Sequence, residues 1–312
     1  MNTQMSGDYE NKENTFSVHK INESSMQNRN FGADITNNKI LVQDPKPKDH
    51  FPPDYSNNDI FALLYTMECN NVAKFGYLRV QSDINERMRA ILVDWLTEVH
   101  LKFKLVAETL YLAVDIMDRY LEKVPITKLR LQLVGVTAML IASKFEDIYA
   151  PEIGDFVYIT DRAYDRDMII GMEASVLKTL EFNISSPNIL LFLEHYCEIL
   201  ATDRKNAMLA RYFAELTLAD YSMLKYRKSL IAAASLFLMH KVMAIQPPWP
   251  ESLKSCSPYN EEDLKICSKD LCILFQKAAR VNLQSVRKKF SLPVYYSVAT
   301  TQINNANSNL YT

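Results

Sequence analysis

The chain has 312 residues, of which 48% are hydrophobic and 23% charged, the composition of a globular protein with a sizeable core. Its 6 glycines are too few for a glycine-rich phosphate loop or for an all-β fold with many tight turns. The net charge of -2 provides no basic field for nucleic acid or for an anionic membrane, so we expect neither as a partner.

The cysteines and the hydropathy pattern indicate which kinds of site and which cellular compartment to expect. The 5 cysteines are scattered and none forms a Cys-x-x-Cys pair, which argues against a zinc site and favours a reducing compartment. We expect neither a metal nor a cofactor. The N-terminus is polar and does not resemble a secretory signal. The longest uncharged apolar run, 133–143, is too short to cross a bilayer, so we expect a soluble intracellular protein.

The first segment, residues 1–53, is rich in Asn, Ser, Lys and acidic side chains and shows no hydrophobic period. Such a segment buries too little apolar surface to offset the entropy of ordering, so we expect a disordered tail. Prolines within 44–53 predict a stiff, extended linker. Order is expected to begin near Asp54.

Helical periodicity then predicts a first unit over residues 54–182. A short amphipathic helix over 59–69 comes first. Ser82-Asp83 followed by Glu86 indicates a capping-box helix start. Further helices are predicted over 107–122, 128–145 and 165–180. The helix over 128–145 is apolar on nearly every side, which is typical of the central helix of a bundle.

A second unit over residues 183–292 repeats this organisation. It contains predicted helices over 188–200, 204–219 and 229–243, and the last is again apolar all round. Small residues such as Gly135 and Ala233 would let neighbouring helices approach these two central helices closely. The sequence therefore predicts an all-α fold of two five-helix units, each around one buried helix, with a preceding N-terminal helix. Residues 293–312 are predicted to form a C-terminal tail, and the basic run 287–289 a solvated helix end.

Several runs resemble the cyclin box in order and spacing. They are Met88-Arg-Ala-Ile-Leu-Val-Asp-Trp-Leu, Glu108-Thr-Leu-Tyr-Leu-Ala-Val, residues 131–146 and residues 151–161. The resemblance covers about residues 55–292 and is strongest over 84–182. The runs His100-Leu-Lys-Phe and Glu152-Ile-Gly-Asp-Phe are more similar to B-type, mitotic cyclins than to A-type cyclins. The family implies that the two units are two tandem cyclin folds.

The resemblance implies a regulatory protein, not an enzyme. A cyclin binds a cyclin-dependent kinase whose αC glutamate points away from the ATP-binding lysine, and it swings that glutamate inward. For a mitotic cyclin the partner is a kinase acting at the G2/M transition. The family also implies residence in nucleus and cytoplasm.

Five residues are implied as kinase contacts. Lys144 ends the central helix of the first unit and Glu173 lies on its last helix, and both would bond to the kinase. Phe145 would be their apolar partner, together with Ile60 and Leu63 on the N-terminal helix. A pair of solvated surface charges with little energetic effect is the alternative interpretation of Lys144 and Glu173.

A second implied surface is a shallow groove that docks Arg-x-Leu peptides of substrates and inhibitors. Glu98 would bind the peptide arginine through a charge-assisted bond, and Gln132 the peptide backbone. The apolar part of the groove would be Met88, Ile91, Leu92 and Trp95. The same four residues also fit a plain core stripe. Lys128 stands where relatives often have arginine.

Arg89 and Asp118 lie within otherwise apolar helices, where a charge is costly unless it is paired. They resemble the buried ion pair of the cyclin box, a structural feature.

The tail contains two candidate degrons. Lys12-Glu13-Asn14 is the three-residue signal read by the anaphase-promoting ubiquitin ligase. The segment beginning at Arg29 resembles a destruction box in which Gly32 stands in place of the usual leucine. Both predict ubiquitin-dependent degradation at mitotic exit.

The residues argue against three rival classes. An enzyme would need a catalytic motif, but the 5 histidines are scattered, and Cys197 near His195 falls on a predicted buried helix. A cyclin-fold transcription factor would show a basic face and commonly a zinc ribbon. A transcription-type cyclin would lack the mitotic runs at 100–103 and 151–161.

Overall fold

The computed structural model describes residues 57–69 and 73–301, and all regular elements in these residues are helical. The predicted all-α fold of two tandem five-helix units is therefore confirmed. The predicted tail over 1–53, with Lys12, Glu13, Asn14 and Arg29, lies outside the described residues.

The first unit surrounds α4 (Lys128–Glu146), which is buried on every side from Leu131 to Ser143. Its neighbours are α2 (Glu86–Phe103), α3 (Ala107–Lys123), α5 (Ile153–Ile159) and α6 (Arg166–Thr179), preceded by α1 (Asn57–Met67) and the short 3-10 helix η2 (Tyr77–Val80). A Cβ added to Gly135 would lie 2.9 Å from the Leu92 methyl carbons. Glycine at this position therefore lets α2 approach α4 closely.

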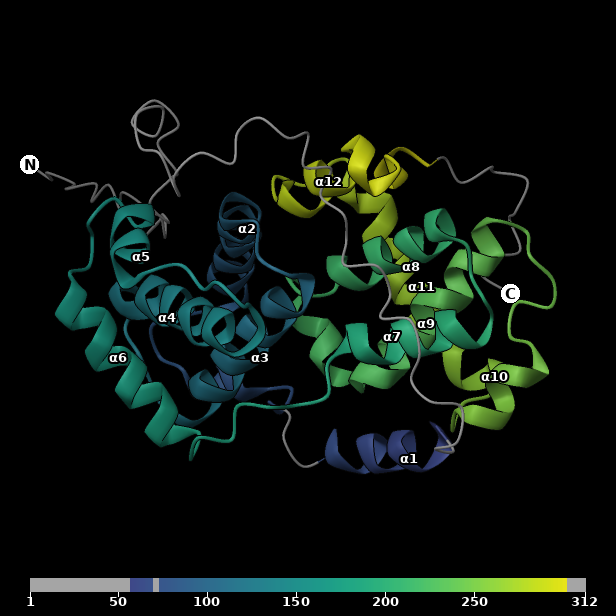
Figure 1. Cartoon of the computed structure of the whole chain (residues 1–312), viewed down its shortest axis with the longest axis horizontal. Helices are drawn as coiled ribbons and strands as arrows, with labels where there is room; N and C mark the ends of the chain where they lie inside the picture. Colours follow the sequence, from purple (N-terminus) through teal and green to yellow (C-terminus); the bar gives the residue numbers. More distant parts are fainter. Residues whose placement is uncertain (1–56, 70–72, 302–312) are drawn as a thin grey trace, which may run out of the picture.

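The second unit surrounds α9 (Lys228–Val242), which is buried from Ile231 to His240. Its other helices are α7 (Ile189–Ile199), α8 (Arg204–Leu216), α10 (Glu251–Cys256) and α11 (Glu261–Ala278), with η3 (Tyr221–Lys225) between α8 and α9. Figure 1 shows the two units side by side, with α1 beneath α7 and α10 of the second unit. The element that follows, α12 (Ser285–Phe290), packs against α2 of the first unit.

Helix starts follow local sequence in some places and distant contacts in others. The predicted helices over 165–180 and 188–200 begin where expected, and the side chains of their first residues, Asp165 and Asn188, cap α6 and α7. The predicted capping box at Ser82-Asp83 is wrong, because Asn85 caps α2. Asp83 instead accepts the backbone N–H of Lys128 at 2.7 Å and so caps the start of α4, 45 residues away.

Two predictions about the C-terminal part need correction. Lys289 is not in a solvated helix end: it is 2% exposed and donates to the Glu215 carboxylate at 2.7 Å. Residues 293–301 do not form a free tail, because the 3-10 helices η4 (Pro293–Tyr295) and η5 (Val298–Thr300) pack back, burying Val298 and Ala299. Short 3-10 turns leave no periodic pattern from which packing can be read.

Candidate binding surfaces

The last turn of α4 emerges from the core and carries the first pair of candidate residues. Lys144 donates to the Glu173 carboxylate of α6 at 2.6 Å, and their side chains are 45% and 16% exposed. The Lys144 cation also lies at the carboxyl end of α4, where it suits the helix dipole. The structure thus brings together the two residues predicted to share one surface.

Large apolar side chains continue this surface. Phe145 is 55% exposed, and Ile148 and Tyr149, in the turn after α4, are 90% and 92% exposed. Sequence reasoning did not single out Ile148 and Tyr149, although an apolar pair in a short turn before Pro151 was a usable signal. We call Lys144, Phe145, Ile148, Tyr149 and Glu173 the α4 patch. An exposed cluster of this kind is typical of a protein-binding surface.

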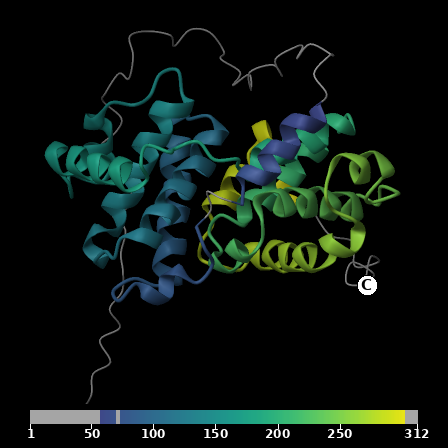
Figure 2. The ribbon, with the colours of Figure 1, turned by 90° about the horizontal axis from the view of Figure 1, so that it is seen from below.

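Ile60 and Leu63 lie on a different element, the outer face of α1, and are 49% and 59% exposed. The inner face of α1 packs on α7: the Phe61 ring stacks on His195 with ring centroids 3.3 Å apart. The hydroxyls of Tyr65 and Tyr196 are 2.9 Å apart. Figure 2 shows α1 lying across the second unit. The five predicted kinase contacts therefore come from three helices: α4 and α6 of the first unit, and α1, which packs on the second unit.

The predicted docking groove is mostly a buried stripe. Leu92 is fully buried against Gly135, and Met88 and Trp95 are 8% and 5% exposed. The expected exposure is thus confined to Ile91 and Glu98, which are partly exposed. Leu92 belongs to the core: glycine at position 135 has no side chain, and the Leu92 methyl groups fill the space that a side chain would occupy. No room for a ligand is left at this point.

Two polar atoms in this region have no hydrogen-bond partner among the described residues. They are the indole N–H of Trp95 on α2 and the side-chain amide nitrogen of Gln132 on α4. A buried donor without a partner costs about 1–3 kcal/mol, so such donors call for an explanation. Because both atoms are buried, a ligand that offers carbonyl oxygens, such as an extended peptide backbone, would reach them only after neighbouring side chains move.

The acidic rim of the groove is held by the second unit. The Ser285 hydroxyl, on the first turn of α12, lies 3.0 Å from a Glu98 oxygen and 2.8 Å from an Asp94 oxygen. The backbone N–H of Ser285 donates to Asp94 at 2.9 Å. Glu98 therefore stands at a fixed position on the same face of α2 as Ile91, two turns further along the helix.

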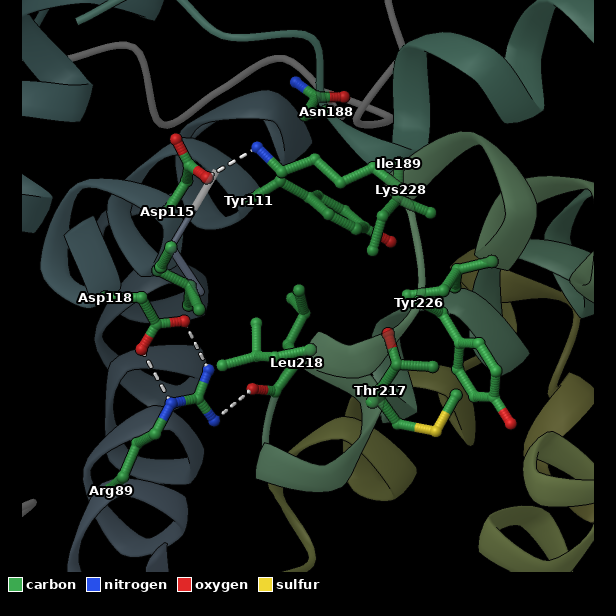
Figure 3. Close-up of a pocket in the computed structure, with 15 residues that line it drawn as sticks. Arg89, Tyr111, Asp115, Asp118, Asn188, Ile189, Thr217, Leu218, Tyr226 and Lys228 are labelled. Atoms are coloured by element: carbon green, nitrogen blue, oxygen red, sulfur yellow. Dashed lines mark hydrogen bonds and ion pairs between the residues drawn. The ribbon is translucent and has the colours of Figure 1, made fainter. Parts of the chain in front are cut away.

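The predicted Arg89–Asp118 pair is confirmed, and it has a further role that the sequence did not indicate. Arg89 donates to Asp118 at 2.7 and 2.6 Å, and Tyr77 donates to the same carboxylate at 2.7 Å. The Arg89 guanidinium also donates to the carbonyl of Leu218 in the second unit at 3.0 Å. Figure 3 shows the bonds of Arg89 to Asp118 and Leu218 beside a cavity of about 60 Å³ that residues of both units line.

A second polar bridge crosses the same boundary. Lys228 at the start of α9 pairs with Asp115 on α3 and donates to the Ser186 hydroxyl at 2.9 Å. Arg119 donates to the carbonyl of Asn183 in the connecting segment at 2.6 Å. These directional bonds fix the orientation of one unit on the other, as a rigid binding surface requires.

Cys197 and His195 do not form a nucleophile–base pair of the kind that a cysteine-dependent enzyme uses. Burial raises the pKa of the Cys197 thiol to about 12, so the thiol stays protonated at neutral pH. His195 lies two residues earlier on α7, points to another face and stacks on Phe61. Among the described residues there is no cluster of metal-ligating side chains, and none of their helices is long and apolar enough to span a membrane.

Comparisons with known proteins identify relatives of the whole helical region. The family models for the cyclin N-terminal domain and the cyclin C-terminal domain match residues 59–185 and 187–304. The chain is 42% identical over 243 residues to the G2/mitotic-specific cyclin-B of Marthasterias glacialis, covering 78% of this chain and 62% of that protein. It is 44% identical over 255 residues to Cyclin-A2 of Gallus gallus, covering 81% of this chain and 64% of that protein.

The chain therefore spans less than two thirds of the length of these curated relatives. Among solved structures, a viral cyclin from herpesvirus saimiri superposes with a TM-score of 0.62 at 20% identity, over 69% of this chain and 97% of that one. This likeness concerns the fold.

Proposed function

Because this chain belongs to the cyclin family, we propose that it is the regulatory subunit of a cyclin-dependent protein kinase that acts at the G2/M transition. The proposal is supported by the similarity to a mitotic cyclin-B and by the B-type runs at 100–103 and 152–156. The chain contributes contact, not catalysis, and the kinase supplies the catalytic groups.

The observation that carries the proposal is the α4 patch. Burying an exposed side chain such as Ile148 or Tyr149 contributes roughly 1.5–3 kcal/mol each to binding before entropy losses. Lys144 and Glu173 lie beside this apolar surface and already form one bond with each other. In the complex their remaining donors and acceptors bond to the kinase αC region, and Ile60 and Leu63 on α1 make a second apolar contact.

Activation follows from differential affinity. A rigid surface that fits only the inward position of the kinase αC helix binds the active conformation more tightly than the inactive one. Moving an equilibrium from 1:99 to 99:1 requires a preference of about 5.5 kcal/mol. The inter-unit bonds of Arg89 and Lys228 hold the first unit, with α4 and α6, in fixed relation to the second unit, on which α1 packs, so little of this preference is lost to rearrangement of the cyclin.

The direct test is reconstitution with purified mitotic cyclin-dependent kinase. The chain should co-purify with the kinase and raise the phosphorylation of a substrate protein at least a hundredfold over the kinase alone. Failure to raise the activity of any cell-division kinase would overturn the proposal.

Substrate docking is the second part of the proposal. Trp95 and Gln132 offer buried donors to a peptide backbone, Ile91 offers apolar surface, and Glu98 binds the arginine of an Arg-x-Leu segment. The groove then favours substrates and inhibitors that carry this segment at a distance from the phosphorylated residue. A titration of the purified chain with an Arg-x-Leu peptide and an Ala-x-Ala control measures this selectivity.

Degradation is the third part. Lys12-Glu13-Asn14 and the segment beginning at Arg29 recruit the anaphase-promoting ubiquitin ligase, which ends kinase activity at mitotic exit. Deleting residues 1–50 should stabilise the protein through mitotic exit, and normal turnover of the deletion variant would exclude the tail as the degron.

We also propose that the protein resides in both nucleus and cytoplasm. Imaging of the tagged full chain through the cell cycle tests this proposal.

A further inference from the structure

The first turn of α9 is capped by a residue that is distant in the sequence. Its N-cap residue, Arg227, makes no side-chain capping bond. The backbone N–H of Ser229 instead donates to the Glu68 carboxylate at 3.0 Å, and the Ser229 hydroxyl donates to the other Glu68 oxygen. Glu68 directly follows α1 and is 2% exposed. The end of α1 is therefore bonded to the start of the central helix of the second unit.

The charge of Glu68 suits this place. Positive partial charge at a helix N-terminus stabilises a carboxylate, and charge-assisted bonds to backbone N–H groups are among the stronger hydrogen bonds. None of the ion pairs found in the described residues includes Glu68. Its carboxylate is therefore stabilised by the hydrogen bonds from Ser229 at the start of α9. Tyr259 also reaches the Ser229 hydroxyl at 2.6 Å and closes the site.

Apart from one bond between the hydroxyls of Tyr65 and Tyr196, 2.9 Å apart, the other contacts of α1 are ring stacking and fix its position less well. Phe61 stacks on His195, and Tyr65 stacks on Phe192 with centroids 5.2 Å apart. Stacked rings tolerate sliding because dispersion contacts are weakly directional. Two short bonds to one carboxylate define both the register and the rotation of α1. The rotation of α1 decides where its outer residues, Ile60 and Leu63, point.

We propose that Glu68 is a positioning residue for the kinase interface: it fixes α1 on the second unit so that Ile60 and Leu63 face the kinase. This inference rests on the proposed kinase-binding function. Glu68 itself is buried against α9 and does not touch the partner. Its loss should therefore weaken association and leave the activity of the assembled complex intact.

The experiment compares the wild-type full chain with E68A, E68Q, I60A/L63A and the triple variant E68A/I60A/L63A. Kinase activity is measured against cyclin concentration, which separates the half-saturating concentration from the plateau. We expect E68A to raise the half-saturating concentration about tenfold with an unchanged plateau, and E68Q to lie between E68A and wild type. In the I60A/L63A background, E68A should add less than a twofold effect, because the residues that it positions are already gone.

Hydrogen exchange of the chain without kinase separates this inference from the proposed function. Residues 57–67 should lose protection in E68A, and α2–α4 should retain theirs. Protection of α1 unchanged in E68A, or a full tenfold effect of E68A on top of I60A/L63A, would overturn the positioning role. A lowered plateau with loss of protection throughout would mean that Glu68 only supports folding. A wild-type chain that activates no kinase would overturn the proposed function, whatever α1 does.

Discussion

Arg89 on α2 donates to the carbonyl of Leu218 across the boundary between the two units, while its Nε and Nη2 groups donate to the Asp118 carboxylate. One guanidinium thus satisfies a charge in the first unit and a backbone acceptor in the second. The Arg89–Asp118 pair therefore contributes to the contact between the two units as well as to the core of the first. The sequence does not reveal this contact, because Leu218 lies 129 residues after Arg89.

This relationship predicts a large effect of D118N. The substitution leaves the Arg89 charge buried and unpaired, and breaking a buried pair on one side costs about 3–5 kcal/mol. Urea unfolding should show that loss. The double variant R89M/D118L removes both charges and should recover most of the stability. If D118N lost under 1 kcal/mol, the pair would have little energetic weight.

The kinase interface predicts a selective effect of the double reversal K144E/E173K. Because both charges are exchanged, the intramolecular pair is kept and melting should stay within 1–2 °C of wild type. Binding to the kinase should fall roughly 30-fold or more, the size of a hot-spot loss above 2 kcal/mol. Co-purification and the concentration dependence of kinase activation measure it.

A matched control exists on α11, where Lys265 and Glu262 form a pair of the same 2.6 Å length far from the α4 patch. The reversal E262K/K265E should leave both melting and kinase binding unchanged. Equal losses in the two reversals would point to a general charge effect and against the α4 patch.

The docking groove predicts opposite effects of one substitution on stability and on binding. Q132M removes a buried donor that has no partner in the described part of the chain, so the chain alone should be as stable as wild type or up to about 1–2 kcal/mol more stable. Affinity for an Arg-x-Leu peptide should fall about tenfold, because the peptide carbonyl loses its donor. Calorimetric titration and thermal unfolding measure the two effects.

Thr137, on the same helix, also has a buried hydroxyl without a partner among the described residues, which makes T137V the control. It should be stabilising as well but leave peptide affinity unchanged. A Q132M chain that binds the peptide as tightly as wild type would contradict the assignment of Gln132 to the groove.

Much of the fold could be predicted from sequence because its signals are local. Apolar periodicity located α2, α4 and α9, and Asp165 and Asn188 marked the starts of α6 and α7 from within their own turns. The Arg89–Asp118 pair could be anticipated because isolated charges in apolar helices require partners. Small residues such as Gly135 indicated close helix approach.

The features that the sequence did not disclose depend on residues far apart in the chain. Asp83 has the spacing of a local cap, but it caps α4 because the bundle brings Lys128 to it. Lys289 lies in a basic run that looks solvated, and only Glu215, 74 positions away, explains its burial. The sequence did not show that Leu92 is more buried than Ile91 in the same apolar stripe. Its burial depends on contact with Gly135 of another helix, where the lack of a side chain leaves room for the Leu92 methyl groups.

His100 predicts how stability depends on pH. Burial lowers its pKa from 6.5 to about 3, and the nearby cations Lys289 and Arg211 act in the same direction. The folded chain therefore keeps His100 neutral, while the unfolded chain binds a proton below pH 6.5. The contribution of His100 to the free energy of unfolding is therefore fully present above pH 6.5. It is lost as the pH falls from 6.5 toward the pKa of about 3 in the folded chain. Between pH 7.5 and 5.5 the loss is about 1.4 kcal/mol.

The variant H100Q isolates this contribution, because glutamine can still donate to the Val106 carbonyl that the imidazole contacts at 2.9 Å but cannot titrate. His195, whose pKa burial lowers to about 4, remains in both proteins and contributes equally to each. The difference in unfolding free energy between wild type and H100Q should therefore shift against wild type by about 1.4 kcal/mol from pH 7.5 to 5.5. Parallel pH profiles of the two proteins would show that His100 is protonated in the folded state as readily as in the unfolded one, which its burial beside two cations does not allow.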